Sequence, residues 1–331
     1  MENYSQIIET EPANNVVYPP KYLAEQGSIT ATIYRSLLSI FFFLGVGYFF
    51  FQRIDIILIL TAIILFHEAG HYFAMRYYHY ADLGIFFIPI LGAFVSGSKR
   101  EVSQKQNAVI LMAGPLPGII LGLILYFIDK NMDGGWYWGD ISVYYVSILL
   151  LFLNLFNLLP VYPLDGGQLL NRVFLDEEGL WSNIFVWLSA IGFAVLAFIS
   201  GLYILLLLPL MIVFRHVGTN RHLALEKELL EEGFDLDTSY EDLSDEKYWT
   251  IRAVIVRNLP TFAGVEAGPP YQYDVKEEKI AQEVEDVLQR NLLLDISMFE
   301  KVALAIIWIL ALCSPIIFNI DLNFLKNFLQ F

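Results

Sequence analysis

Apolar runs recur along the chain at lengths that suit membrane helices. A helix needs about 20 apolar residues to cross the hydrocarbon core of a bilayer, which is about 30 Å thick. Seven runs reach or approach this length: Tyr34–Phe51, Ile56–Tyr78, Ala108–Ile128, Val143–Leu159, Ile184–Ser200, Leu202–Phe214 and Val302–Phe318. Only Ser200 and Gly201 separate the fifth run from the sixth. The two runs therefore form either a tight hairpin or one bent helix. The pattern predicts an all-α polytopic membrane protein with about six to seven transmembrane helices.

Residues 83–99, between the second and third runs, are apolar but interrupted by Pro89, Gly92 and Gly97. Aromatic and β-branched residues are frequent here, so the segment favours a short β-hairpin over a helix. Irregular backbone is tolerated at membrane depth only where protein or a water-filled cavity surrounds it. We therefore expect a membrane-embedded β-hairpin whose edge could pair with an extended peptide. The alternative is an interfacial loop that only seals the helix bundle.

The polar positions concentrate in one stretch near the end of the chain. Residues 217–298 contain 18 acidic and 8 basic residues. Two amphipathic helical patterns flank the strand-like sequence TIRAVIVR at 250–257, which predicts a small α/β cytoplasmic module. The predicted domains are a polar cytoplasmic N-terminal tail (1–33), a transmembrane core (34–216), the acidic module (217–298), and a C-terminal transmembrane helix with a tail (299–331). The module either selects what the core acts on or caps the helix bundle.

Composition agrees with a membrane protein. The 331 residues are 56% hydrophobic and only 17% charged, where a soluble domain has about 25% charged residues. The lipid bilayer is therefore an expected partner. A formal charge of −15 makes nucleic acid an unsuitable one. The single cysteine, Cys313, excludes both an internal disulfide and a cysteine-based zinc site.

The distribution of Lys and Arg predicts the orientation, because short cytoplasmic loops carry an excess of both. With a cytoplasmic N-terminus, basic residues on the cytoplasmic side outnumber those on the other: Lys21, Arg35, Arg76, Lys99, Arg100, Lys105, Arg172, Arg215 and Arg221 against Arg53, Lys130 and Lys326. The first residues show no basic start and no apolar core, so a cleavable signal peptide is not expected. These features suit a prokaryotic plasma (inner) membrane.

The second apolar run contains the sequence LFHEAGH at 65–71. On a helix, His67 and His71 project from one face one turn apart, as two ligands of a tetrahedral zinc ion must. Glu68 points elsewhere, so its expected role is that of general base rather than ligand. Ionisable groups inside an apolar helix are costly and tend to be functional. The alternative is that core hydrogen bonds satisfy both histidines.

A catalytic zinc site needs a third protein ligand. The best candidate is Asp165 in the sequence NLLPVYPLDGG at 157–167, because it follows an apolar helix that breaks at two prolines. Gly166 and Gly167 would let the backbone fold back closely. The alternative is an ordinary turn aspartate. The other histidines lie near the membrane surface or at the start of the polar stretch and are poorer candidates: His79, His216 and His222.

Three motifs in this order, HEAGH at 67–71, AGPLPG at 113–118 and NLLPVYPLDGG at 157–167, resemble the site-2 protease family of intramembrane zinc metalloproteases. LGAFVSG at 91–97 also resembles that family's membrane hairpin. The resemblance covers residues 55–175, about a third of the chain. One departure is Gly118, at or beside which many members of the family have Asn. The chain shows no PDZ-like insertion between the third and fourth runs, and residues 217–298 do not suit a paired CBS module.

The resemblance implies a zinc-dependent metalloendopeptidase that hydrolyses a peptide bond within or near a transmembrane segment of a membrane-protein substrate. It implies one Zn²⁺ per chain held by His67, His71 and Asp165, with Glu68 as catalytic acid/base. Asn157 matches the family's Asn, which is thought to hold the substrate or the oxyanion. In the predicted orientation, the active site lies toward the cytoplasmic side.

Other function classes fit the sequence less well. Membrane metallopeptidases with a downstream glutamate as third ligand do not match, because no Glu lies between Glu101 and Glu177. A di-iron membrane oxidase needs about eight clustered histidines, and the chain has 5. A catalytically silent relative, which binds membrane helices or metal without cleavage, is the main alternative. Retention of Glu68 argues against it, since a pure zinc site does not need that carboxylate.

Overall fold

The structure is a computed structural model that describes residues 17–23, 29–89, 91–99, 101–139, 141–175, 179–288 and 291–320. The described residues fall into two compact units. The membrane unit lies within residues 27–218 and 291–331, and the helical unit lies within residues 1–26 and 219–290. Helix α8 (Leu207–Glu231) continues from the first into the second. The N-terminal segment thus groups with the polar stretch, although the membrane unit separates the two in sequence.

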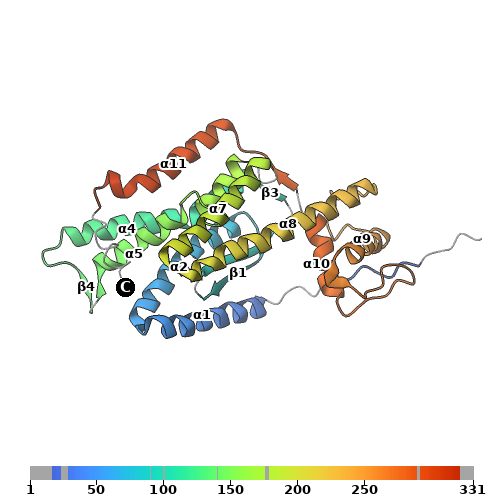
Figure 1. Cartoon of the computed structure of the whole chain (residues 1–331), viewed down its shortest axis with the longest axis horizontal. Coiled ribbons are helices and arrows are strands. Elements are labelled where there is room, and N and C mark those ends of the chain that lie inside the picture. The colour runs from blue at the N-terminus through green and yellow to red at the C-terminus, as the bar shows by residue number, and fades with distance from the viewer. Residues whose placement is uncertain are drawn as a thin grey trace, which may run out of the picture. The chain divides into compact units, whose positions relative to one another are not determined.

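All seven apolar runs form helices (Figure 1). In the described chain, 5 helical stretches are long and apolar enough to cross a membrane: Thr30–Phe50 within α1 (Ile29–Phe51), α2 (Ile54–Tyr77), Gln104–Lys130 across α3 (Gln104–Ala113) and α4 (Pro115–Lys130), α7 (Leu180–Ser200) and α11 (Met298–Ile317). Two apolar helices are shorter: α5 (Val143–Asn157), and Tyr203–Phe214 from η2 (Tyr203–Leu206) into α8. The mostly helical membrane fold is confirmed, and six or seven spans stay a prediction.

Ser200 and Gly201 separate two helices instead of bending one. Gly201 ends α7 in the left-handed conformation, with φ of 71°, which glycine adopts without a steric penalty. The short helix η2 then leads into α8. Pro209 lies in the first turn of α8, where a backbone N–H has no partner within the helix to lose.

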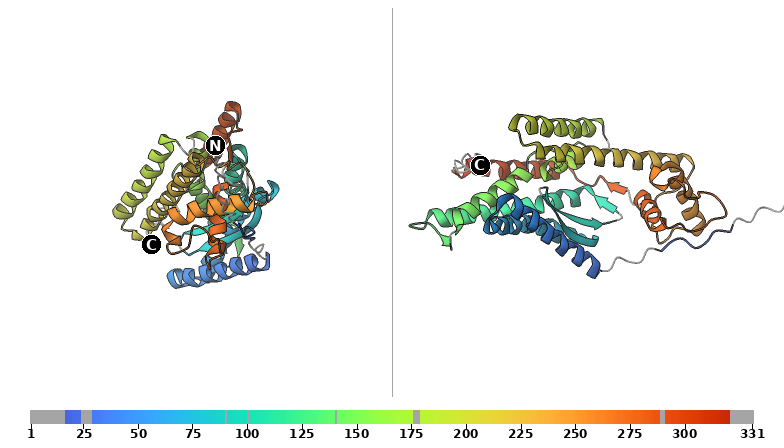
Figure 2. Two further views of the ribbon diagram at one scale, coloured as in Figure 1. Left: turned by 90° about the vertical axis from the view of Figure 1, so that its right-hand side faces the viewer. Right: turned by 60° about the horizontal axis from the view of Figure 1, so that its bottom comes forward.

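The predicted hairpin is present as β1 (Ala81–Ile88) and β2 (Gly92–Ser98), which pair in antiparallel register with Phe86 opposite Phe94. The hairpin lies beside α1 (Figure 2, right). The backbone N–H of Phe87 donates to Ser39 Oγ of α1 at 3.0 Å, so it points away from β2. The α1 side therefore occupies the outer edge of β1.

Two smaller sheets lie beside the ends of helices in the membrane unit. Strands β4 (Tyr137–Trp138) and β5 (Ile141–Ser142) pair antiparallel between α4 and α5. Strands β3 (Glu101–Ser103) and β6 (Asn291–Leu293) pair parallel, which joins the start of α3 to the segment before α11. Asp295 strengthens this junction by accepting hydrogen bonds from Ser103 Oγ at 2.6 Å and Lys105 N at 3.1 Å. Desolvation alone would raise the pKa of Asp295, but these bonds hold it below its ordinary value.

Helix α5 has 15 residues and is about 22 Å long, shorter than the apolar core of a bilayer. The chain then passes through a loop with two prolines into α6 (Asp165–Leu169) and η1 (Leu170–Phe174). Trp308 of α11 fixes the start of this loop, because its Nε1–H donates to the carbonyl of Leu158 at 2.8 Å. Both residues belong to the buried cluster that packs α3, α4, α5 and α11 together. The start of the loop is thus buried at Leu158, whereas Leu159 and Pro160 are exposed.

The strand predicted at 250–257 is wrong, because these residues lie in helix α9 (Asp245–Asn258). Ser244 caps the helix by accepting a hydrogen bond from Lys247 N, and Asp245 is in the first turn. Ile251, Val254 and Ile255 are fully buried in the core that α9 forms with α10 (Glu277–Leu288). Burial on a helical stripe overrides the preference of Ile and Val for strands. The described part of the helical unit therefore contains helices and loops. Within the predicted module, 217–298, a strand is present only at β6 (Asn291–Leu293) among the described residues, and it pairs with β3 in the membrane unit.

Candidate metal centre

Helix α2 presents His67 and His71 on one buried face. Their spacing of four residues places the rings one turn apart, and their exposed fractions are 6% and 7%. Each ring is held at Nδ1: His67 by Asn154 Oδ1 at 2.8 Å, and His71 by the carbonyl of Ile110 at 2.8 Å. These contacts turn the Nε2 atoms of the two rings toward each other, 3.1 Å apart.

Asp165 begins α6, and the glycines that follow it are required by the close return of the chain. A Cβ on Gly166 would lie 2.0 Å from the carbonyl oxygen of Leu158, and a Cβ on Gly167 would lie 2.2 Å from the carbonyl carbon of Val161. No larger residue fits at either position without moving backbone. This confirms the expectation that the Gly-Gly pair lets the chain fold back and shows why the motif ends in Asp-Gly-Gly.

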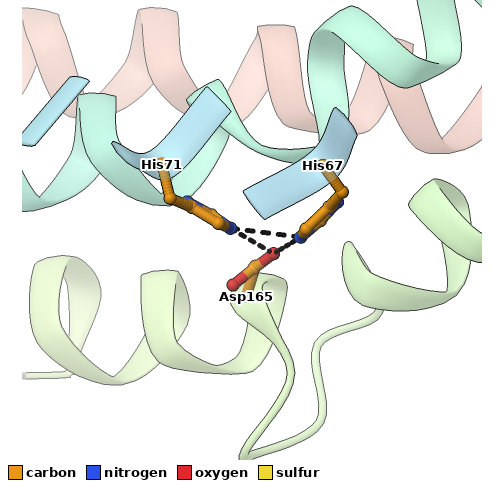
Figure 3. A group of neighbouring side chains, drawn as sticks. All are labelled: His67, His71 and Asp165. Atoms are coloured by element: carbon orange, nitrogen blue, oxygen red, sulfur yellow. Dashed lines mark hydrogen bonds and ion pairs between the residues drawn. The ribbon is translucent and has the colours of Figure 1, made fainter. Parts of the chain in front are cut away.

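The structure brings the three predicted ligands together (Figure 3). Asp165 Oδ2 lies 3.0 Å from His67 Nε2 and 3.3 Å from His71 Nε2. One ligand atom from each residue lies within 4.8 Å of the others, and all three residues are buried. Residues separated by about a hundred positions in the sequence therefore converge from α2 and α6 on one point.

The hydrogen bonds of the two rings show which kind of ligand would fit between the three side chains. The carbonyl of Ile110 can only accept, so His71 Nδ1 carries the proton. Asn154 Nδ2 donates to the carbonyl of Leu150, so Asn154 Oδ1 accepts from His67 Nδ1. With Nδ1 as the donor, Nε2 is the atom of each ring left to bind a metal ion, and the two Nε2 atoms point at each other and at a carboxylate oxygen. Asp165 Oδ2 is buried and, despite these short distances, accepts no well-aligned hydrogen bond. Three electron-pair donors around one point suit a divalent cation, and this donor set suits zinc.

Glu68 lies next to these ligands in α2, with 6% of its surface exposed. Adjacent residues of a helix point about 100° apart, so Glu68 does not share the direction of the His67 ring. It is not among the three residues whose ligand atoms converge. The position agrees with a carboxylate beside the metal centre and not within it.

Asn154 is a site residue that the sequence reasoning missed. It is fully buried in α5 and bridges His67 Nδ1 to the carbonyl of Leu150. Its space depends on Gly118 of α4, where a Cβ would lie 2.2 Å from Asn154 Nδ2. An asparagine inside the apolar sequence SILLLFLNLF was the available signal, since a buried amide in such a helix needs a partner.

Asn157, the predicted substrate-binding residue, is half-buried in the last turn of α5. Its Nδ2 donates to the carbonyl of Leu153 at 3.2 Å. No contact with the three converging residues is among its hydrogen bonds in the described chain. Its role in catalysis stays a prediction.

The AGPLPG motif lets helices approach closely at the metal centre. A Cβ on Gly70 of α2 would lie 2.0 Å from the carbonyl oxygen of Ala113, and a Cβ on Gly114 would lie 2.2 Å from His71 Nε2. Glycines at both positions therefore bring α2 against the junction of α3 and α4. Gly114 of this motif thus leaves the space that the His71 ring occupies.

Replacing Asn154 by leucine is expected to weaken metal binding by about 10–100-fold, because a partner that orients a ligating histidine typically has this effect. Leucine keeps the volume in the apolar core but cannot accept from His67 Nδ1. Zinc affinity of the purified protein, measured by competition with a chromogenic chelator, checks the prediction. Leu153→Ala, on the same helix, is the control. Unchanged affinity in Asn154→Leu would show that the bond to His67 does not position the ring.

Comparisons with known proteins found one family model, several curated relatives and a solved structure that are similar to parts of this chain. Residues 55–134 match the family model described as Peptidase family M50. Zinc metalloprotease MJ0392 of Methanocaldococcus jannaschii is 30% identical over 133 residues, which is 39% of this chain and 37% of that protein. Stage IV sporulation protein FB of Bacillus subtilis is 28% identical over 121 residues, 37% of this chain and 41% of that protein. The solved structure of the site-2 protease from Methanocaldococcus jannaschii aligns with a TM-score of 0.41 and 24% identity, over 54% of this chain and 85% of that one.

The fold is that of a polytopic membrane protein, and it brings together three buried residues that could hold a metal ion. The matches to peptidase family M50 and to zinc metalloproteases confirm the resemblance to the site-2 protease family. The chain spans about two fifths of the length of these curated relatives. The matched family region includes His67, Glu68 and His71 but ends before Asp165, so the position of Asp165 rests on the geometry of this chain.

Proposed function

We propose that the chain is an intramembrane zinc metalloprotease that hydrolyses a peptide bond within or near a transmembrane segment of a membrane protein. The observation that carries the proposal is the convergence of His67 Nε2, His71 Nε2 and Asp165 Oδ2 beside the buried Glu68. The names of the curated relatives and the M50 match support the zinc-dependent class.

His67, His71 and Asp165 would hold one zinc ion per chain, and three protein ligands leave a fourth position open. When bound, zinc supplies a Lewis acid that activates water and polarises a carbonyl group. Glu68 would take the proton from the attacking water and return it to the leaving amine. A carboxylate that is buried but not a ligand is free to do both. The residues therefore divide into three that bind metal and one that moves a proton.

Asn157 is proposed to hold the substrate or to donate to the developing oxyanion. In the structure its Nδ2 donates to the carbonyl of Leu153. The proposed role requires that this weak local bond be exchanged for one to the substrate. Such a donor typically contributes about 3 kcal/mol to catalysis in enzymes where it has been measured.

The hairpin offers a way to hold an unwound substrate. A helix hides its peptide bonds within its own hydrogen bonds, so a transmembrane substrate must become extended before cleavage. The outer edge of β1 is occupied by Ser39 of α1. In the described part of the chain, the backbone of β2 has no hydrogen-bond partner besides β1. The outer edge of β2 is therefore where a substrate strand would add.

The register shows which groups face that edge. Phe87 N–H points outward from β1, so Phe87 and its partner Ala93 form a non-hydrogen-bonded pair. Ile85 and Val95, two residues along, form the next such pair. The N–H groups of Ala93 and Val95 therefore point to the outer edge of β2.

Val95→Pro is expected to lower cleavage by about tenfold without changing zinc content, because it removes an outward N–H and leaves the β1–β2 bonds intact. Val95→Ala, which keeps the N–H, is the matched control. Rates on a membrane substrate in proteoliposomes, with zinc measured in the same samples, check the prediction. Equal rates in the two variants would remove β2 as the substrate edge.

Location and partners belong to the same proposal. We infer a multi-pass protein of a prokaryotic plasma membrane, with a cytoplasmic N-terminus and the metal centre toward the cytoplasmic side. Protein substrates with transmembrane segments and the surrounding lipid are the expected partners. The apolar helices and the M50 match support the membrane location.

The experiment that tests the proposed function is a search for new N-termini. Zinc-loaded protein is incubated in proteoliposomes with a set of single-span membrane proteins, and the products are sequenced by mass spectrometry. Cleavage within transmembrane segments that a zinc chelator stops would support the protease. Binding of these proteins without any cleavage, by folded and zinc-loaded protein, would favour the catalytically silent relative.

A further inference from the structure

The N-terminal segment Val17–Leu23, with the sequence VYPPKYL, lies on the surface of the helical unit. It forms neither helix nor strand, and each of its residues remains half-buried or exposed. The core beneath it is quite different, since Tyr248, Trp249 and Val254 are fully buried. The segment therefore lies on the outside of this core, against which Tyr18 and Tyr22 pack as partly buried side chains.

Aromatic side chains of the helical unit receive the segment. Trp249 lies against Tyr271 and Tyr273, with ring centroids 5.2 Å and 5.6 Å away. Tyr18 stacks on Tyr271 at 5.2 Å, and Tyr22 meets the edge of Tyr273 at 5.9 Å. The rings of Trp249, Tyr271 and Tyr273 thus form one aromatic cluster, which Tyr18 and Tyr22 contact on either side of the two prolines.

The same side chains donate hydrogen bonds to the backbone of the segment. Trp249 Nε1–H donates to the carbonyl of Pro19 at 2.7 Å, and the hydroxyl of Tyr273 donates to the carbonyl of Pro20. The hydroxyl of Tyr240 donates to the carbonyl of Tyr22 at 2.5 Å. A proline-rich segment has exposed carbonyls and restricted φ angles, so it presents these acceptors with little entropy to lose.

The contacts of Lys21 make the surface of the helical unit selective for the sequence of the segment. Its Nζ donates to the carbonyl oxygens of Tyr240 and Leu243, both at 2.8 Å, and also to that of Glu241. The three donors of an ammonium group are therefore all used. The backbone N–H of Lys21 donates to Asp245 Oδ1 at 2.7 Å. Neither a neutral nor a shorter side chain could make these contacts.

We propose that the helical unit is a recognition surface for a Tyr-Pro-Pro-Lys-Tyr segment, and that residues 18–22 are its resident ligand. Aromatic grooves that donate to the carbonyls of proline-rich peptides are a recurring recognition mode. The partner that this surface fits is a segment of the same chemistry in another protein, which exchanges with residues 18–22. The proposal does not depend on the protease function.

The resident segment is covalently attached, so its effective concentration at the surface is in the millimolar range. A free segment must therefore compete against a high local concentration. Exchange with a partner consequently releases residues 18–22 from the surface of the helical unit.

The first test uses a chain that lacks residues 2–23. A fluorescein-labelled peptide of residues 17–23 is titrated against this chain and against the full chain in detergent, and anisotropy is recorded. The peptide is expected to bind the shortened chain and not the full chain. Tyr273→Phe in the shortened chain, at a half-exposed position, is expected to weaken binding by about 2–10-fold. Tyr137→Phe, in the membrane unit, is the matched control and is expected to leave binding unchanged.

The second test uses a variant that folds with residues 17–23 still attached. A specific protease site is inserted between residues 23 and 29, the chain is purified and cut, and retention of the released segment is followed by gel filtration. Excess peptide 17–23 is expected to displace the segment, and the Lys21→Met peptide to do so at least about tenfold less well. A segment that no peptide displaces, or equal displacement by both peptides, would overturn the proposal and leave a fixed structural strap.

Discussion

Replacing Glu68 by glutamine is expected to lower peptide-bond cleavage by about 10²–10⁴-fold while zinc remains bound. Glutamine keeps the shape of the side chain and fits the buried position, where Glu68 is 6% exposed. It cannot accept the proton of the attacking water. Because the three converging ligand atoms come from other residues, the substitution leaves the metal centre itself intact.

Two measurements on the same preparation separate the proton-transfer role of Glu68 from a structural role. Zinc content by mass spectrometry should equal that of the wild type, and crosslinking should still capture a membrane substrate. Single-turnover cleavage should be lost. Glu231→Gln, at an exposed position in α8, is the matched control and should cleave normally. Wild-type cleavage by Glu68→Gln would show that another group moves the proton.

The sequence predicted that His67, His71 and Asp165 lie together, because local rules mark these residues. Helical spacing alone places His67 and His71 on one face, and chemistry separates Glu68 from them. Asp165 could not be placed from helical spacing, since its position depends on a close return of the chain that only Gly166 and Gly167 permit. The convergence of these residues was expected, but the sequence could not supply the 3.0 and 3.3 Å distances that make it specific.

Asn154 shows why the partners of the ligands were harder to predict. Its bond to His67 is made between α5 and α2, helices 87 positions apart at these residues, and no spacing rule connects them. Gly118, which the sequence presented only as a departure from a family pattern, proves to be the neighbour that leaves room for Asn154. The link between Gly118 and Asn154 is visible only in the structure, because no sequence rule connects the two positions.

In the helical unit, the prediction of a strand from local sequence failed. TIRAVIVR has the composition of a strand, but Ser244 starts a helix before it and α10 buries its apolar stripe. Local preference for strand was therefore outweighed by tertiary packing. The hairpin at 81–98 was predicted correctly because glycine and proline interrupt it and no amphipathic helix competes.

Replacing Asp165 by alanine is expected to remove zinc from the protein. Two neutral imidazoles would then face a divalent cation in a buried apolar setting, with no anionic ligand to offset its charge. Partners that only orient a ligand already contribute about 10–100-fold to affinity, so loss of a ligand should exceed this. His67→Ala should have a similar effect.

Asp165→Asn separates charge from shape at this position. It keeps the volume beside Gly166 and Gly167 but removes the negative charge, so zinc should be lost from it almost as fully as from Asp165→Ala. Zinc is measured by mass spectrometry after dialysis against a chelator, and thermal unfolding in detergent shows whether each variant is folded. Asp295→Ala, which lies outside the metal centre, is the carboxylate control. About one zinc per chain in the wild type and in Asp165→Ala alike would break the link between the two motifs, because the histidines would then hold the ion without α6. The catalytically silent relative would become the better description.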